Sequence, residues 1–341
     1  MMNDKKSIVQ KIFELPRILT LVLCIILIIA PHFLGISNTA MLTRIMIFSV
    51  FAMAYDILRG YVGLVHLGFA LFIGGGAYFV GIMFLQFGTT LPNLLLAVLG
   101  TLIYSVFWAL IVAKIAGKSG FLATAMVTMA FAEIMRNVAE RWRTVTGGQD
   151  GLSFSVPAPF SDRMFMYYAS FVFLIVMAFI LYKFITSPTG RVWQAVRDNE
   201  QRAIFLGYDT NRARTIALVV AAVAGGLAGV MFGLFNRFAN AELFGMQMTY
   251  NAMLYSILGG SGTLFGSIIG SALVIYFQSF LLDLRHVHPI FDRWLLFFGA
   301  LYIVVVMFMP HGILGYYRNW KENREIKKKL QSEETLKQKQ P

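Results

Sequence analysis

The sequence predicts an all-α fold, that of a polytopic integral membrane protein with about ten transmembrane or re-entrant helices and an inverted repeat. Three observations support this prediction. Hydrophobic residues make up 58% of the 341 residues and charged residues only 13%, whereas a soluble domain has roughly 25% charged residues. The apolar residues gather into runs, with the positive charges between and beyond them. Glycine-rich stretches occur in both halves of the chain.

Ten apolar runs could span or enter a bilayer. They cover residues 18–36, 40–58, 61–87, 91–115, 121–138, 164–185, 213–235, 246–259, 264–282 and 291–309. The runs 246–259 and 264–282 could instead form a re-entrant hairpin, which would lower the number of crossings by two without changing the side on which the chain ends. The first run resembles a signal peptide, but no small-residue cleavage site closes it, so we expect an uncleaved span.

The orientation is predicted from the basic segments 1–17, 186–214 and 316–341, because cytoplasmic loops near span ends carry an excess of Lys and Arg. Alternating the ten runs from an inside amino terminus brings all three segments to the cytoplasmic side. The membrane domain then occupies residues 18–315, and the loop 139–163 lies outside despite Arg141 and Arg143. The net charge of +12 is thus explained by topology and by a tail attracted to membrane lipids, and we expect no nucleic acid partner.

The glycine-rich stretches predict where helices are interrupted. Glycine occupies positions 60, 63, 68, 74, 75, 76 and 81 in one half and 259, 260, 262, 266 and 270 in the other. Paired interruptions are typical of inverted-repeat transporters, whose broken helices line a site near the membrane midplane. Close helix packing is the alternative, and we favour it for Gly225, Gly229 and Gly233 and for Gly262, Gly266 and Gly270. For the triplet 74–76 both interpretations remain open. The candidate substrate pathway comprises Gly63, His66, Phe69, Gly74, Gly75, Gly76, Tyr78, Gly259 and Gly260.

Ionisable residues inside apolar runs need a partner or a function. The spacing of three between Asp56 and Arg59 predicts an ion pair near the cytoplasmic face, and Glu133 and Arg136 predict a second pair that faces the bundle. His66 has no such neighbour. Its imidazole could offer a hydrogen bond to substrate or cap a broken helix.

The loop 186–214 is predicted to contain a short amphipathic helix. Ser187 and Pro188 are helix-start signals and Gly207 is a stop signal. Val192, Val196, Ala203 and Leu206 recur near helical spacing on one face, with charged residues elsewhere. The helix could lie on lipid headgroups or bind a cytoplasmic partner. Trp193 is expected at a span end, with its ring at the headgroup level.

Chemistry in the chain itself is not expected. The end of a phosphate-binding loop is imitated by Gly117, Lys118 and Ser119, but Val112 stands where the first glycine is required. Cys24 is the only cysteine, which excludes disulfides within the chain and thiolate metal sites. The sequence therefore predicts neither an enzyme nor a resident cofactor or metal, and active transport would need energy from a partner chain or an ion gradient.

Five segments carry a resemblance to a known family. They are GYVGLVHLGFALFIGGGAY at 60–78, AFAEIMRNVAERWRTVTGGQDGL at 130–152, GRVWQAVRDNEQRAIFLGYD at 190–209, LGGSGTLFGSIIGSAL at 258–273 and PHGILG at 310–315. In this order they resemble the permease subunits of bacterial ABC importers for branched-chain amino acids, of the LivM type. The resemblance implies an inner-membrane protein that pairs with a second, similar permease, two cytoplasmic ATPases that carry Mg-ATP, and a periplasmic protein that delivers leucine, isoleucine or valine.

The resemblance also implies an ATPase-coupling motif in the loop 186–214. Its residues here are Arg197, Asp198, Asn199, Glu200, Ala203 and Gly207, and Arg202 stands where the family has an alanine. The same resemblance places residues 146–151 on the periplasmic face. Two alternatives remain: a permease of the same type for another small solute, such as urea, aromatic acids or other carboxylates, and a channel or carrier that works without ATP.

Overall fold

The computed structural model describes residues 27–116 and 121–284, together with isolated positions between 296 and 312. A helical segment over residues 27–33 leads into the main bundle. The elements then follow as α3 (Ile36–Asp56), the π-helix η1 (Ile57–Val62), α4 (Ala70–Phe87), α5 (Leu91–Ala116), α6 (Phe121–Arg141), α7 (Arg143–Thr146), η2 (Gly148–Asp150), β1 (Leu152–Ser153), α8 (Ala158–Ser161), α9 (Arg163–Thr186), α10 (Pro188–Asp198), α11 (Glu200–Phe205), α12 (Thr210–Asn236), β2 (Phe238–Ala239), η3 (Ala241–Phe244), α13 (Met246–Gly259) and α14 (Gly266–Leu284).

Six of the described helices are long and apolar enough to cross a membrane. They coincide with six of the ten predicted runs, which confirms an all-α, multi-span membrane fold. The fifth run corresponds to α6 and the eighth to the shorter α13. Residues 18–26 of the first run, most of the last run, the segment 1–17 and the tail 316–341 lie outside the described residues.

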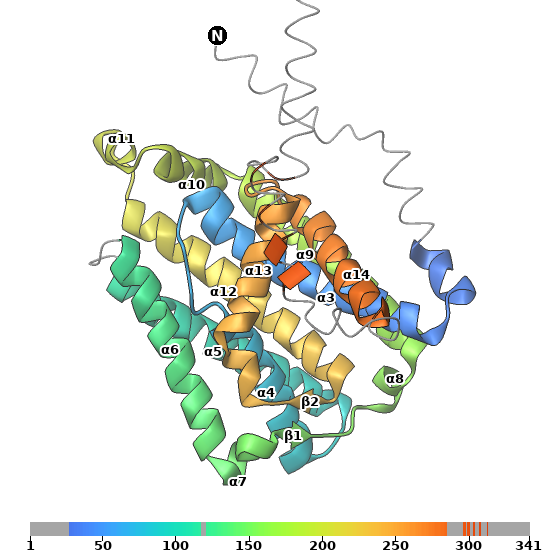
Figure 1. Cartoon of the computed structure of the whole chain (residues 1–341). Helices are drawn as coiled ribbons and strands as arrows, with labels where there is room; N and C mark the ends of the chain where they lie inside the picture. The colour runs from blue at the N-terminus through green and yellow to red at the C-terminus, as the bar shows by residue number, and fades with distance from the viewer. Residues whose placement is uncertain are drawn as a thin grey trace, which may run out of the picture.

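The two ends of the bundle differ in structure (Figure 1). Helices α10 and α11 form an arm at one end, which we call the arm end. At the opposite end, β1 pairs with β2 in antiparallel register, Leu152 facing Ala239 and Ser153 facing Phe238. We call this the strand end; α7 and α8 also lie there. The loops 186–214 and 139–163 therefore lie at opposite ends, as their predicted placement on opposite sides of a membrane requires.

The elements α3, α4 and α5 recur in order as α12, α13 and α14. Thr210 follows Ile36 by 174 residues, Met246 follows Ala70 by 176, and Gly266 follows Leu91 by 175. The π-helix η1 that continues α3 ends in a left-handed residue, Gly63 with φ 80°, and α12 ends in Arg237 with φ 55°. Because α3 ends beside the arm and α12 begins there, the two sets run in opposite directions (Figure 1).

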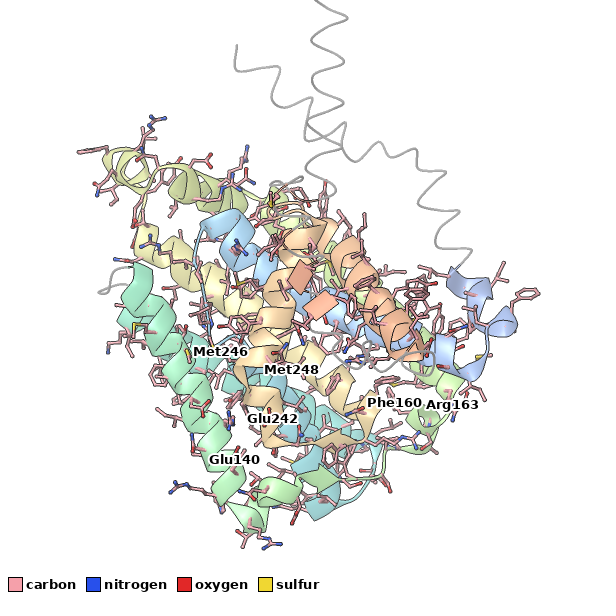
Figure 2. The ribbon with its side chains drawn as sticks, in the orientation of Figure 1. Glu140, Phe160, Arg163, Glu242, Met246 and Met248 are labelled. Carbon is pink, nitrogen blue, oxygen red and sulfur yellow. The ribbon has the colours of Figure 1, made fainter. Side chains whose placement is uncertain are left out.

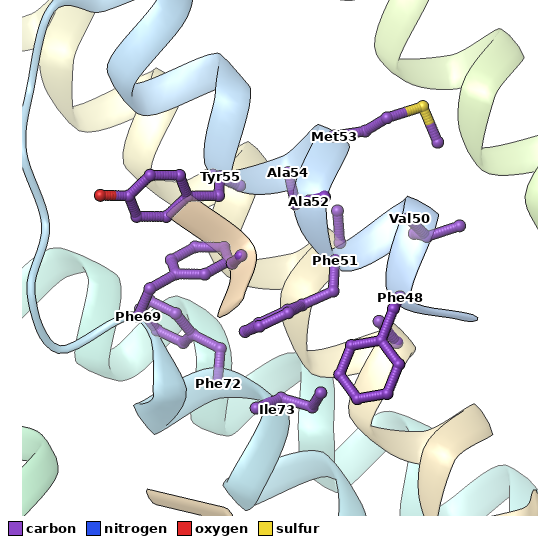
Figure 3. Packing of buried hydrophobic residues seen from close by; sticks show 14 of the residues in the cluster. Phe48, Val50, Phe51, Ala52, Met53, Ala54, Tyr55, Phe69, Phe72 and Ile73 are labelled. Atoms are coloured by element: carbon purple, nitrogen blue, oxygen red, sulfur yellow. The ribbon is translucent and has the colours of Figure 1, made fainter. Parts of the chain in front are cut away.

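Aromatic side chains of α3 and the start of α4 fill the centre of the bundle (Figure 3). The rings of Phe51 and Phe69 stack with centroids 5.0 Å apart, and Phe69 lies edge-on to Phe72 at 5.5 Å. Behind them α12 approaches α4 closely. A Cβ on Gly229 would lie 2.2 Å from the Ile73 carbonyl oxygen, so the packing predicted for the series 225, 229 and 233 is confirmed.

The second glycine series differs from its prediction. Gly266 and Gly270 do pack against α13, since a Cβ on Gly270 would lie 1.9 Å from the Tyr255 carbonyl oxygen. Gly262 is not part of that helix. It lies in the turn between α13 and α14 with φ 76°, a left-handed conformation that favours glycine. The four-residue spacing between Gly262 and Gly266 therefore does not reflect packing along one helix.

Candidate functional site

Helical structure is interrupted between η1 and α4, over residues 63–69, and we call this segment the break. Gly63 ends η1 in the left-handed conformation, its N–H bonded to the Leu58 carbonyl, and residues 63–66 then run without helical structure before a turn at 67–69 leads into α4. A helix end of this kind is the usual role of a left-handed glycine. Helix α4 consequently begins at Ala70, inside the bundle, and runs to the strand end.

The glycine triplet 74–76 does not break α4, which is continuous from Ala70 to Phe87. The physical reason is that consecutive helix positions point in different directions. A Cβ on Gly74 would meet the Phe244 ring at 2.6 Å, one on Gly75 the Tyr104 ring at 2.1 Å, and one on Gly76 the Gly226 carbonyl oxygen at 2.1 Å. The triplet therefore lets three different neighbours approach, which favours packing of the two interpretations left open for it, and the helix is interrupted earlier, at residues 63–69.

A second helix begins beside this break. Met246 and Met248, at the start of α13, lie in the middle of the bundle between the arm end and Glu140 (Figure 2). The Thr249 hydroxyl accepts a hydrogen bond of 2.9 Å from the Ala70 N–H. The starts of α4 and α13 are thereby joined. From there α13 runs to the arm end, so the segment from β2 through α13 leads from the strand end to the arm end.

His66 lies in the break and is 2% exposed. Its ring packs against Phe69 and Phe72, with centroid distances of 6.0 and 5.8 Å. Within the described part of the chain, neither ring nitrogen has a hydrogen-bond partner. The first N–H of α4 is bound by Thr249 and not by His66. The imidazole is thus free to form a hydrogen bond with a group that enters the break.

The remaining residues of the predicted pathway fall into two places. Phe69 lies next to His66, and Tyr78 further along α4 stacks on Phe244 at 5.5 Å. Gly63, Gly259 and Gly260 lie instead at the arm end: Gly63 borders Arg197, Gly259 ends α13, and Gly260 begins the turn 260–265. The structure therefore brings His66 and Phe69 together at the break but separates them from the glycines of the other half.

Asp56 does not form the ion pair with Arg59 that its spacing predicts, since the ion pairs of the described residues do not include it. Its carboxyl group is fully buried, and Oδ1 accepts hydrogen bonds from the Ser256 hydroxyl at 2.7 Å and the Gly262 N–H at 2.9 Å. The carboxylate faces α13 and the following turn because Gly60 leaves room there.

The second predicted pair is present but faces outward. Arg136 lies 3.5 Å from Glu133 and 3.1 Å from Glu140. The side chains of Arg136 and Glu133 are 33% and 46% exposed, so this cluster lies on the flank of α6 and not inside the bundle. Spacing correctly predicted the pair, whereas the direction it faces depends on tertiary packing.

The arm contains two helices where one was predicted. Ser187 caps α10 as expected, its hydroxyl accepting from the Gly190 N–H. Asn199 is extended, with φ −163°, and its side chain accepts from the Arg202 N–H, so α10 ends there and α11 begins. Trp193 is fully buried and donates from Nε1 to the Ala213 carbonyl at 2.9 Å. It anchors α10 to α12. Its position near a span end had suggested a ring at the headgroup level, but the ring is buried within the protein.

Of the predicted coupling residues, only Ala203 is buried, whereas Arg197, Asp198, Asn199 and Gly207 are exposed. Arg197 binds Asp198 and the Gly60 carbonyl, Glu200 pairs with Arg214 at 2.7 Å, and Ala203 is 1% exposed. Gly207 ends the arm with φ 83°. The tip of the arm also exposes three apolar side chains: Ile204, Phe205 and Leu206 are 47%, 87% and 68% exposed. Leu206, predicted on the apolar face of the arm helix together with Val196 and Ala203, lies just after α11 and is exposed. In the sequence, this tip is recognisable as the consecutive apolar residues Ile204, Phe205 and Leu206, which follow a charged stretch.

These features define a multi-pass α-helical membrane protein in which two helices, α4 and α13, begin inside the bundle and a helical arm projects from one end. The family model for the branched-chain amino acid transport system permease component matches residues 37–307. The chain therefore belongs to that permease family. Members of this family are described as permease components of a transport system.

Several curated relatives are similar to this chain. The high-affinity branched-chain amino acid transport system permease protein LivM of Salmonella typhimurium is 24% identical over 350 residues, which is 92% of this chain and 77% of the relative. The LivH permease protein of the same system in Escherichia coli is 30% identical over 129 residues, 38% of this chain and 40% of the relative. The autoinducer 2 import system permease protein LsrC of Photorhabdus laumondii is 34% identical over 119 residues, 33% and 35% respectively. No solved structure matches the chain.

Proposed function

We propose that this chain is a permease subunit of an ABC importer and forms half of the translocation pathway for branched-chain amino acids. The family and the LivM relative, which spans most of the chain, support both the machinery and the cargo. The LivH relative supports a second, similar permease as the partner that completes the pathway. Mg-ATP would be bound by cytoplasmic ATPase subunits, and the chain itself would need no cofactor.

The pathway is proposed to pass the break that contains His66 and Phe69. Two helix sets of the same order and opposite direction support an inverted repeat, in which broken helices meet near the membrane midplane. The starts of α4 and α13 meet in this way through Ala70 and Thr249. A small zwitterion crossing here would find a buried imidazole with unused hydrogen-bonding capacity beside apolar rings, which suit an aliphatic side chain.

The observation that carries the ATPase coupling is the exposed tip Ile204–Phe205–Leu206 on a buried base. Apolar side chains exposed to water are costly, at about 25 cal/mol per Å², and a partner that covers them gains this energy. The base, with Trp193, Val196 and Ala203 at 0%, 4% and 1% exposure, holds the tip in place. We therefore assign the arm end to the cytoplasm and the strand end, with the loop 139–163, to the periplasm, where a substrate-binding protein would bind.

The test is copurification of the affinity-tagged chain from inner membranes of a cell that encodes the whole system. Wild type should retrieve the second permease and the ATPase subunits. Phe205→Asp should lose the ATPases and keep the second permease, whereas the matched Phe205→Leu should keep both. Retention of the ATPases by Phe205→Asp would show that the tip is not the docking surface. ATP-independent uptake by wild type would favour the channel or carrier.

The cargo is tested separately. The LsrC relative, named for the import of autoinducer 2, makes a permease of the same type for another small solute the second candidate. Vesicles that contain the complete transporter should accumulate radiolabelled leucine, isoleucine and valine and leave phenylalanine and urea outside. The opposite preference would retain the machinery and replace the cargo.

A further inference from the structure

We infer that Asp56, Gly60, Arg197 and Gly262 form a latch that transmits movement of the arm to the break in the pathway. This inference rests on the proposed function. It assigns Arg197 and Asp56 a role as positioning residues that act through α13, distinct from contact with the ATPase or with the cargo. The contacts that support it can be followed from the arm inward.

The first contact joins the arm to η1. Arg197 is the penultimate residue of α10, and its Nη1 donates to the Gly60 carbonyl. Its Nε and Nη2 donate to Asp198 at 3.1 and 2.9 Å, which fixes the plane of the guanidinium group. Carbonyls near a helix end have no partner within the helix and accept bonds from outside. Arg197 is therefore directed toward the core, although it lies on the arm.

Two glycines make this contact possible. A Cβ on Gly60 would lie 2.3 Å from the Gly262 nitrogen and 2.4 Å from Oδ1 of Asp56. A Cβ on Gly262 would lie 3.0 Å from the Gly60 carbonyl oxygen and 3.1 Å from Nη1 of Arg197. The backbones of η1 and the turn 260–265 thus touch directly, and the guanidinium group lies against both.

The turn 260–265 is hydrogen-bonded to two elements, the end of α3 and η1. Oδ1 of Asp56 accepts from the Gly262 N–H, and the Tyr61 hydroxyl accepts from the Leu264 N–H at 3.1 Å. Asp56 also accepts from the Ser256 hydroxyl, which lies on α13 itself. A buried carboxylate with charge-assisted hydrogen bonds is a strong tether. Movement of η1 is consequently passed to the turn and to α13.

Helix α13 leads from the latch to the break. It has 14 residues, and at about 1.5 Å per residue it is a rod roughly 20 Å long. Ser256 near one end is bound by Asp56, and Thr249 near the other end is bound to Ala70, four residues after His66. The described contacts therefore form a continuous path from Arg197 to the start of α4.

The experiment uses the complete transporter in proteoliposomes and measures uptake and ATP hydrolysis together. Arg197→Ala should still assemble with the ATPases and hydrolyse ATP, but the amount of cargo moved per ATP should fall about tenfold. A change of this size lies within the roughly 5- to 150-fold range that is typical of coupling between two sites. Arg197→Lys, which can still reach the Gly60 carbonyl, should recover part of this ratio. Arg191→Ala, which removes an exposed arginine from the same helix, is the matched control and should leave the ratio unchanged.

The opposite side of the latch gives an independent variant. Gly60→Ala would push η1 from the turn while Arg197 is intact, and it should produce the same fall in cargo per ATP. Asp56→Asn keeps an oxygen acceptor for Ser256 and Gly262 and should be milder than Asp56→Ala. A wild-type ratio in both Arg197→Ala and Gly60→Ala would overturn the latch. Loss of the ATPases from Arg197→Ala would also overturn it, because Arg197 would then be a docking residue.

A second measurement does not depend on ATP-driven uptake. Amide hydrogen exchange of the purified chain should show faster exchange over residues 260–264 in Arg197→Ala than in Arg191→Ala, since the turn loses its guanidinium neighbour. Equal exchange in the two variants would contradict the latch. If wild type proves not to use ATP, the proposed function fails, and this exchange comparison still decides whether Arg197 holds the turn.

Discussion

The Thr249 hydroxyl and the Ala70 N–H form a hydrogen bond of 2.9 Å between two residues that are both fully buried. Ala70 is the first residue of α4 and Thr249 lies in the first turn of α13. The first N–H groups of a helix have no partner within the helix, so a side chain from elsewhere must satisfy them. Here a hydroxyl group in the first turn of α13 caps the start of α4, and this hydrogen bond joins the two helix starts.

Replacing this hydroxyl tests the junction. Thr249→Val keeps the shape but leaves the Ala70 N–H without an acceptor, and we expect a loss of about 1–3 kcal/mol of stability. The apparent melting temperature of the detergent-solubilised chain should fall clearly. Thr249→Ser retains the acceptor and should melt close to wild type. If the valine and serine variants melt alike, the hydroxyl does not hold the two helices together.

The contact between α4 and α12 depends on Gly76. An alanine there would place its Cβ 2.1 Å from the Gly226 carbonyl oxygen and 2.8 Å from the Val230 nitrogen. Because backbone atoms cannot move aside as a flexible side chain can, we expect Gly76→Ala to destabilise the protein by about 1–3 kcal/mol. Gly35→Ala is the control, since φ is −64° there and no atom lies within 4 Å. Equal thermal stability of the two variants would refute the close approach.

Much of the fold could be predicted from the sequence because a bilayer imposes simple requirements. A lipid-embedded backbone must satisfy its own hydrogen bonds, so long apolar runs become helices, and the six span-length helices match six predicted runs. Local spacing was equally informative for Glu133 and Arg136, which are three residues apart and form an ion pair. Such features are decided within one helix.

The candidate site was less predictable because its contacts join distant segments. Asp56 is bound by Ser256 and Gly262, 200 and 206 residues away, whereas its spacing suggested Arg59. Trp193 is buried because Ala213, 20 residues later, returns beneath it. The glycine triplet 74–76 lies within a continuous helix, and the sequence alone could not distinguish a break from contacts with three neighbours.

His66 offers a test that separates stability from transport. Its buried ring nitrogens have no partner in the described part of the chain, so His66→Leu removes unsatisfied polar atoms and should leave stability unchanged or raise it by about 1 kcal/mol. Uptake should nevertheless decline, with a higher KM, if the imidazole binds cargo in the break. A parallel loss of melting temperature and uptake would show that His66 is structural. Wild-type uptake in a stable variant would remove it from the pathway.

The pair Glu200–Arg214 ties α11 to α12, with an O–N distance of 2.7 Å and side chains 38% and 26% exposed. Partly exposed ion pairs contribute about 1 kcal/mol or less, so neither Glu200→Arg nor Arg214→Glu should unfold the protein. Each should instead loosen the arm and reduce retention of the ATPase subunits, because like charges then face each other. The double swap restores opposite charges at the same distance and should recover retention. If the double swap retains no more ATPase than the single variants, the pair does not position the arm, and Glu200 must act through a direct contact with the partner.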